Sequence, residues 1–179
     1  NGLDRDWVLV GNGGDELLFD TALAWGGPGR TFLNLPPTFS VYAANARLTS
    51  TPILDIPRVD GFAIDEPRVL EAVADPVCGI TFTIVASPNN PTGLRADPAF
   101  LEQLLEATDA LVMVDEAYFE FSRQTMRPHL ERHKNLVILR TFSKAFSLAG
   151  VRIGYLLAHP DVIREYLKVR QPYSVDAVS

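Results

Sequence analysis

Short apolar runs alternate with amphipathic segments along the whole chain. The apolar runs fall at residues 7–10, 31–35, 80–86, 111–115, 137–141 and 153–158. Segments in which apolar residues recur at helical spacing lie between them, at 16–24, 39–46, 66–74, 98–107 and 161–170. Because several of the runs are continuously apolar, they suit strands that are covered on both faces. The pattern therefore predicts an α/β fold, with a largely parallel central sheet and helices on both faces.

Local signals mark where these elements begin and where the chain turns. Asp97 and Asp161 precede helical segments and are predicted caps, since an acidic side chain accepts a bond from the first unpaired amides. The proline and glycine clusters at 26–29, 36–37 and 89–91 predict turns. The polar stretch 122–134 is expected to be a surface excursion.

Composition narrows the class of protein. The 179 residues are 47% hydrophobic and 21% charged, which is usual for a globular domain. A net charge of -6 argues against a non-specific nucleic-acid surface, and no apolar run approaches the roughly 20 residues that cross a bilayer. The single cysteine, Cys78, cannot form an internal disulfide, which fits a reducing compartment such as the cytoplasm.

Polar residues follow three of the predicted strands. Asn90 comes after the run at 80–86, Asp115 ends the run at 111–115, and Lys144 follows the run at 137–141. In open parallel sheets, ligands bind at the carboxyl ends of the strands. The sequence therefore predicts one site that gathers these three side chains.

Lys144 is the candidate nucleophile of this site. It lies among small and hydroxylic residues, a setting typical of a lysine that forms a Schiff base with a carbonyl cofactor. Thr141, Ser143 and Arg152 could bind a phosphate through two hydroxyls and a guanidinium. The alternative for Lys144 is an ordinary surface lysine.

Asp115 ends an apolar strand, where an unpaired carboxylate is costly. Its partner could be a protonated pyridine nitrogen or, as in nucleotide hydrolases, a magnesium ion. The chain has no phosphate-loop lysine after its glycine-rich turn, which argues against the hydrolase. Tyr118 could donate to a phenolate oxygen of a cofactor, or serve as a core aromatic.

The remaining candidates lie in turns. The amides of Gly14 and Asp15, at a predicted helix start, could cradle a phosphate, although the glycines taken alone favour a plain tight turn. Asn90 could bind a cofactor oxygen or act only in its turn, and Phe39 could stack on a ring or pack in the core. His129 and His133 share helical spacing, but no third ligand is apparent and no metal is assigned.

Five motifs occur in the order GNGGDE (11–16), PPTF (36–39), SPNNPTG (87–93), DEAYFEF (115–121) and RTFSKAFSLAGVR (140–152). Together they resemble the fold-type I pyridoxal-phosphate aminotransferases, and most closely the histidinol-phosphate aminotransferase family. The resemblance implies that residues 1–179 are the large cofactor-binding domain and that 160–179 begin the connection to a small domain. It also implies a homodimer that exchanges an amino group between a small-molecule amino donor and a 2-oxo acceptor.

The resemblance gives the candidate residues definite roles toward pyridoxal 5'-phosphate. Lys144 would form the internal aldimine and then shuttle a proton, and Asp115 would pair with the pyridine nitrogen. Asn90 and Tyr118 would bind the ring oxygen, while Phe39 would stack on the ring where many relatives have tyrosine. The remaining candidates would hold the phosphate: Gly14, Asp15, Thr141, Ser143 and Arg152.

Two residues of the family pattern are not found in this sequence: an upstream tyrosine that reaches the neighbouring subunit's phosphate and a C-terminal arginine for the substrate carboxylate. We therefore expect an incomplete chain with weak turnover by itself. Histidinol phosphate with 2-oxoglutarate is the expected substrate pair. The alternatives are an aromatic amino acid aminotransferase, a threonine-phosphate decarboxylase, and a non-catalytic domain that senses pyridoxal phosphate.

Overall fold

A single mixed sheet organises the chain. The computed structural model describes residues 2–177, and its seven strands are ordered β1-β7-β6-β5-β4-β2-β3. Strand β7 runs antiparallel to both of its neighbours, β1 and β6, while β2 through β6 run parallel to one another. The strands are β1 (Val8–Asn12), β2 (Thr31–Asn34), β3 (Ile53–Asp55), β4 (Ile80–Ala86), β5 (Leu111–Asp115), β6 (Leu136–Thr141) and β7 (Ile153–Ala158). The predicted α/β fold with a largely parallel sheet is confirmed.

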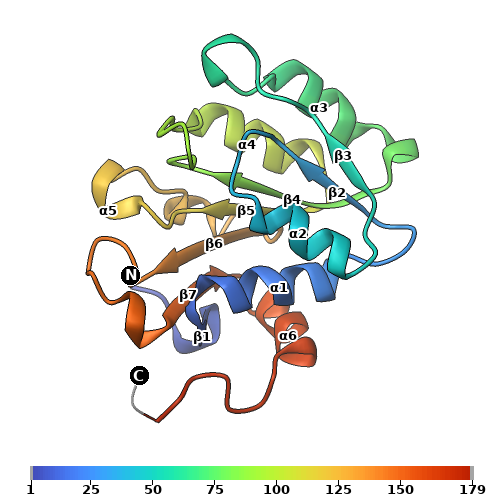
Figure 1. Ribbon diagram of the computed structural model, residues 1–179. Helices are drawn as coiled ribbons and strands as arrows, with labels where there is room; N and C mark the ends of the chain where they lie inside the picture. Colours follow the sequence, from blue (N-terminus) through green and yellow to red (C-terminus); the bar gives the residue numbers. More distant parts are fainter. Residues whose placement is uncertain (1, 178–179) are drawn as a thin grey trace.

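Helices cover both faces of this sheet (Figure 1). Helices α1, α2 and α6 pack on one face and α3 and α4 on the other. Their bounds are α1 (Gly13–Trp25), α2 (Val41–Leu48), α3 (Glu66–Ala74), α4 (Pro98–Ala107) and α6 (Pro160–Val169), with a one-turn helix α5 (Phe119–Ser122) after β5. Among residues 2–177, every helix is too short or too polar to cross a bilayer.

The pleat of β5 divides its side chains between two cores. Leu111 and Met113 join the core beneath α1, α2 and α6, whereas Val112 and Val114 join the core beneath α3 and α4. Successive side chains of a strand point to opposite faces. By the same alternation Asp115 lies on the α1 and α2 side of the sheet, where it is 6% exposed.

The structure differs from the sequence-based expectations in three places. Strand β3 was not predicted, because it is short, edge-located and only partly buried. The predicted surface excursion at 122–134 is partly wrong, since Met126 and Leu130 are buried beside α4 in the second core. Helix α6 is capped by His159, whose Nδ1 accepts from the Asp161 amide, rather than by Asp161 itself. The Asp97 cap of α4 is confirmed.

Candidate active site

A pocket opens at the carboxyl ends of β4, β5 and β6, next to the start of α1. All ten residues predicted from the sequence line it: Gly14, Asp15, Phe39, Asn90, Asp115, Tyr118, Thr141, Ser143, Lys144 and Arg152. They come from segments far apart in the chain, so the sheet topology brings them together. Apolar side chains complete the walls: Leu18, Ala86, Pro88, Ala117, Leu139 and Ala149.

Asp115 forms the floor of the pocket. Its Oδ2 accepts a 2.5 Å bond from the Tyr42 hydroxyl, and its Oδ1 accepts a 2.9 Å bond from the Ala117 amide. Burial raises the pKa of the Asp115 carboxyl above its ordinary value, while these two bonds and the charge of Lys144 pull it down. A carboxylate held in this way is a ready partner for a cationic group.

The first turn of α1 also lines the pocket. The amides at a helix start have no partner within the helix and attract anions. Gly13 has φ +74°, which strains any other residue, and a Cβ built on it would lie 2.4 Å from Arg152 Nη2 and displace the guanidinium from the turn. Arg152 Nη2 also lies 3.3 Å from Asp15 Oδ2, in a partly exposed ion pair. A cation and helix amides therefore converge on one spot.

Gly154 on β7 lets α1 come this close to the sheet. A Cβ at this position would lie 2.6 Å from the Gly14 nitrogen and 2.7 Å from the Gly13 carbonyl carbon. Both atoms belong to the backbone, so no side chain could move to relieve the contact. The first turn of α1 is thus placed by a small residue on a strand that is distant in sequence.

The segment after β6 carries the hydroxyls and the lysine. Thr141 Oγ1 accepts from the Ser143 amide at 3.1 Å and donates to the Ile153 carbonyl at 3.4 Å, which fixes the turn. Lys144 Nζ lies 5.8 Å from the centre of the Tyr118 ring. Lys144 is exposed in this chain and also lines the pocket.

The two asparagines of the SPNNPTG turn have separate tasks. Asn89 is 2% exposed, and its amide bonds the Pro37 carbonyl, the Thr38 hydroxyl and the Thr92 hydroxyl, so it holds the loop together. Asn90 lines the pocket instead. Asn90, and not Asn89, is likewise the candidate site residue that the sequence predicts.

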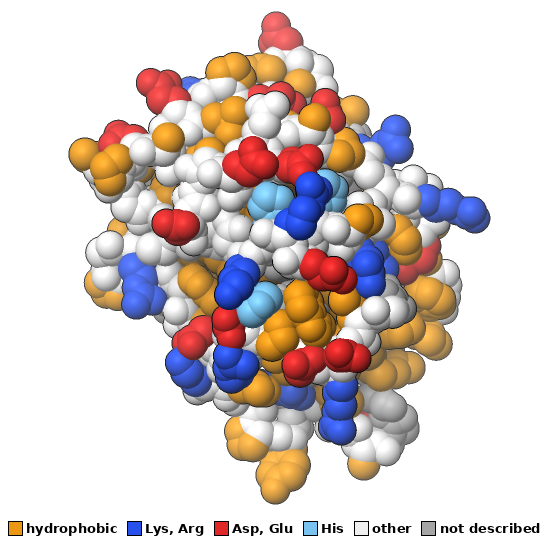
Figure 2. Space-filling view, turned by 180° about the vertical axis from the view of Figure 1, so that it is seen from behind, with side chains coloured by type: hydrophobic (Ala, Val, Ile, Leu, Met, Phe, Trp, Pro, Cys, Tyr) orange, Lys and Arg blue, Asp and Glu red, His pale blue; other side chains and the backbone are white. Residues whose placement is uncertain are grey.

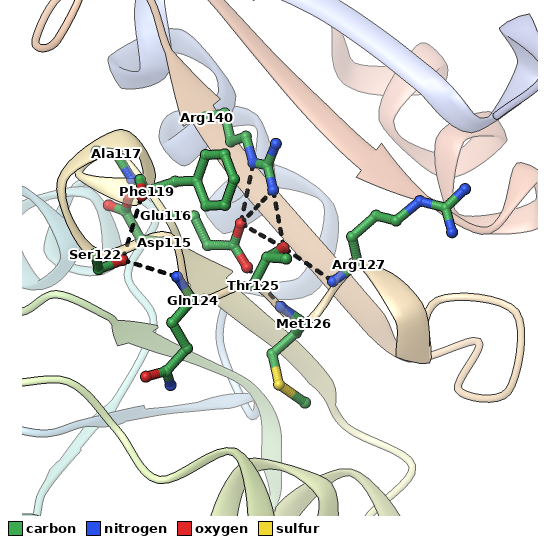
Figure 3. Close-up of polar contacts among 10 residues, drawn as sticks. All are labelled: Asp115, Glu116, Ala117, Phe119, Ser122, Gln124, Thr125, Met126, Arg127 and Arg140. Carbon is green, nitrogen blue, oxygen red and sulfur yellow. Dashed lines mark hydrogen bonds and ion pairs between the residues drawn. The ribbon is translucent and has the colours of Figure 1, made fainter. Parts of the chain in front are cut away.

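Glu116, next to Asp115, does not line the pocket and instead lies in a polar network (Figure 3). Its Oε2 accepts from Arg140 Nη2 at 2.8 Å and from the Thr125 hydroxyl at 2.9 Å, and its Oε1 accepts from the Met126 amide at 2.8 Å. Arg140 also lies 3.8 Å from the centre of the Phe119 ring. Since Glu116 is committed to these contacts, the Asp115–Glu116 pair does not present two carboxylates to a magnesium ion.

Tyr42 was missed by the sequence reasoning. It lines the pocket, is 2% exposed, and meets Phe39 edge-on at 5.5 Å between ring centres. The available signal was the PPTFSVY stretch (36–42), in which Tyr42 follows Phe39 at helical spacing. Its hydrogen bond to Asp115 depends on the packing of α2 against the end of β5, which no local pattern reveals.

Comparisons with known proteins agree with this architecture. A sequence profile of the family described as "Aminotransferase class I and II" matches residues 2–179, and the chain belongs to that family. Histidinol-phosphate aminotransferase 1 of Carboxydothermus hydrogenoformans is 43% identical over 172 residues, which are 96% of this chain and 48% of that protein. The chain thus spans about half the length of the curated relatives that it matches.

Solved structures share the fold. The histidinol-phosphate aminotransferase of Sinorhizobium meliloti, crystallised in complex with pyridoxal-5'-phosphate, has a TM-score of 0.83 at 27% identity and covers 95% of this chain and 47% of that one. The L-threonine-O-3-phosphate decarboxylase of Porphyromonas gingivalis has a TM-score of 0.84 at 25% identity, covering 99% of this chain and 52% of that one.

Proposed function

We propose that this protein is a pyridoxal-phosphate-dependent transaminase and that the pocket between α1 and the ends of β4, β5 and β6 is its cofactor site. The observation that carries the proposal is that one pocket gathers the buried carboxylate of Asp115, the side chains of Lys144 and Tyr118, and Arg152 beside the first turn of α1. Family membership supports the same conclusion.

The donor set fits pyridoxal phosphate group by group. The buried carboxylate of Asp115 matches a protonated ring nitrogen, and the helix amides with Arg152 match a phosphate. The narrow approach between Gly13 and Arg152, which a Cβ would fill, is the kind of backbone cradle that a phosphate needs. Phe39 supplies an aromatic face at the side of the pocket.

When bound, pyridoxal phosphate supplies an electron-withdrawing ring that stabilises negative charge at the α-carbon of an amino donor. In this proposal Asp115 keeps the ring nitrogen protonated, and Tyr42 and the Ala117 amide hold its carboxylate in place. The Lys144 amine would hold the cofactor, and the same amine would serve as the group that moves a proton to and from the substrate carbon. Asn90 and Tyr118 orient the ring oxygen, and Thr141 and Ser143 add hydroxyls to the phosphate end.

We assign histidinol phosphate as the amino donor and 2-oxoglutarate as the acceptor, which places the protein in histidine biosynthesis. The 43% identity to a histidinol-phosphate aminotransferase over nearly the whole chain supports this assignment. We further propose that residues 1–179 form the large cofactor domain of a cytoplasmic homodimer. Exposed Phe121, Phe146 and Leu148, close in sequence to Tyr118 and Lys144, support a second subunit covering this edge.

Substrate assays on the purified native protein test the proposal. With pyridoxal phosphate and 2-oxoglutarate present, histidinol phosphate should yield glutamate faster than phenylalanine or tyrosine does. If threonine phosphate releases carbon dioxide and no glutamate forms, the protein is a decarboxylase and not a transaminase. If the folded protein takes up no pyridoxal phosphate, the cofactor assignment itself is wrong.

A further inference from the structure

Two histidines and a glutamate meet on the surface away from the cofactor pocket. His129 ends a short 3-10 turn (Arg127–His129), His133 follows it by four residues, and Glu102 comes from the middle of α4. One ligand atom from each lies within 4.8 Å of the other two. On the face shown in Figure 2, histidine side chains reach the surface beside acidic and basic groups.

The backbone presents the two imidazoles on the same side. The His133 amide bonds the His129 carbonyl at 3.0 Å, which closes one helical turn, and the ring centres are 6.3 Å apart. Leu130 lies between the two histidines in the sequence, and its fully buried side chain anchors this turn in the core. The spacing is the one by which two histidines on one helix face bind a transition metal.

The distances approach those of a metal site. His129 Nδ1 lies 3.4 Å from Glu102 Oε1, and His133 Nε2 lies 4.0 Å from the same oxygen. Metal–ligand bonds of about 2.0–2.1 Å in a tetrahedral site place neighbouring ligand atoms about 3.3–3.4 Å apart. The first pair already meets this separation, and a small rotation of the His133 ring would bring the second pair to it.

Arg132 marks the point at which the ligand atoms converge. Its Nη2 lies 2.8 Å from Glu102 Oε1 and 2.9 Å from His129 Nδ1. Because arginine only donates hydrogen bonds, the bond to His129 forms in the tautomer whose Nδ1 is unprotonated, and the same tautomer presents Nδ1 to a metal. The Arg132 side chain is 61% exposed, so it can move into solvent when another cation takes its place.

We propose that Glu102, His129 and His133 form a zinc site, with water as the fourth ligand and Arg132 as the competing cation. Two imidazoles and one carboxylate are borderline ligands that suit zinc and its first-row neighbours rather than calcium or magnesium. The ion would join α4 to the segment 127–133 in place of the Arg132–Glu102 ion pair, and it would add to the apolar packing between them.

The test is a cobalt and zinc titration of the untagged protein, loaded with pyridoxal phosphate. Cobalt should produce the visible absorption of a four-coordinate site at one ion per chain, and zinc should displace it and raise the melting temperature. His129→Ala/His133→Ala should abolish the absorption, and Glu102→Gln should weaken binding at least tenfold. Arg132→Ala should tighten binding, because it removes the competing charge.

His159→Ala is the matched control, since His159 lies 3.4 Å from Asp161 but outside the cluster. It should bind cobalt as the unchanged protein does. The proposal is overturned if His129→Ala/His133→Ala, folded by circular dichroism, still binds one cobalt ion, or if His159→Ala loses the signal instead. Weaker cobalt binding in Arg132→Ala would also contradict the proposal. This variant is expected to fold, because it changes a single surface residue.

Discussion

The Tyr42 hydroxyl donates a 2.5 Å hydrogen bond to Asp115 Oδ2, and both side chains are buried at the end of β5. The bond connects α2, through Tyr42, to the carboxylate that we assign to the cofactor's ring nitrogen. It lowers the pKa of Asp115 against the larger upward effect of burial. Tyr42 therefore positions the carboxylate and favours its charged form.

Tyr42→Phe should reduce turnover roughly tenfold, because a hydrogen bond to a charged group contributes about 1.5–3 kcal/mol. Without it the pKa of Asp115 rises, so the acid limb of the pH–rate profile should move to higher pH. Tyr166→Phe is the matched control: its hydroxyl also makes a buried bond, to Thr21 at 2.8 Å, but this bond joins α6 to α1 and does not involve the pocket. A profile that shifts equally in both variants would contradict the assigned role.

Lys144→Ala should abolish covalent capture of the cofactor. The chain has lysines only at 134, 144 and 168, so borohydride reduction followed by peptide mapping distinguishes them directly. Loss of one amine at an exposed position should leave the melting temperature nearly unchanged. Lys168→Ala, which removes an exposed partner of Glu165 on α6, should keep the reduced adduct at Lys144. An adduct that persists in Lys144→Ala would refute the attachment site.

Arg140→Met should destabilise the fold by about 3–5 kcal/mol, because it leaves the buried Glu116 carboxylate without its cationic partner. Adding Glu116→Gln should restore part of this loss, since the two residues belong to one network. Urea denaturation measures both effects. Lys168→Met, in the exposed pair with Glu165, should change stability by no more than about 0.5 kcal/mol. A similar small effect at Arg140 would mean that the buried pair contributes little.

The buried carboxyl of Asp20 should make the stability of the protein depend on pH. This residue is 3% exposed on α1, its Oδ2 has no hydrogen-bond partner among the described residues, and burial followed by the charge of Glu16 raises its pKa from 3.8 to about 6. Between about pH 4 and pH 6 the folded state binds more protons than the unfolded state. Stability should therefore fall as pH rises through this window, by on the order of 3 kcal/mol, and stay level with respect to Asp20 above it.

Asp20→Asn should remove this slope and be more stable than the unchanged protein above pH 6. Urea denaturation at a series of pH values from 4 to 7.5 measures the difference. Asp109→Asn, at an exposed position, should retain the slope of the unchanged protein. If Asp20→Asn shows the same pH dependence as the unchanged protein, another group is responsible.

Much of this protein could be inferred from the chain alone because the relevant signals are local. Continuous apolar runs such as Leu111–Val114 specify strands buried on both faces. Helices α3 and α4 begin and end where their spacing predicts, and α4 has its predicted Asp97 cap. The polar residues that follow β4, β5 and β6 could be assigned to one site, because parallel strands end at the same edge of a sheet.

Other features required contacts between distant segments. Tyr42 meets Asp115 only because α2 packs over the end of β5, and Gly154 matters only because α1 begins against β7. Likewise, the sequence paired His129 with His133 by spacing, but Glu102 joins them through the packing of α4 beside their turn. Periodicity and motif order determine elements and their sequence along the chain, whereas the partners of individual side chains depend on how those elements pack in three dimensions.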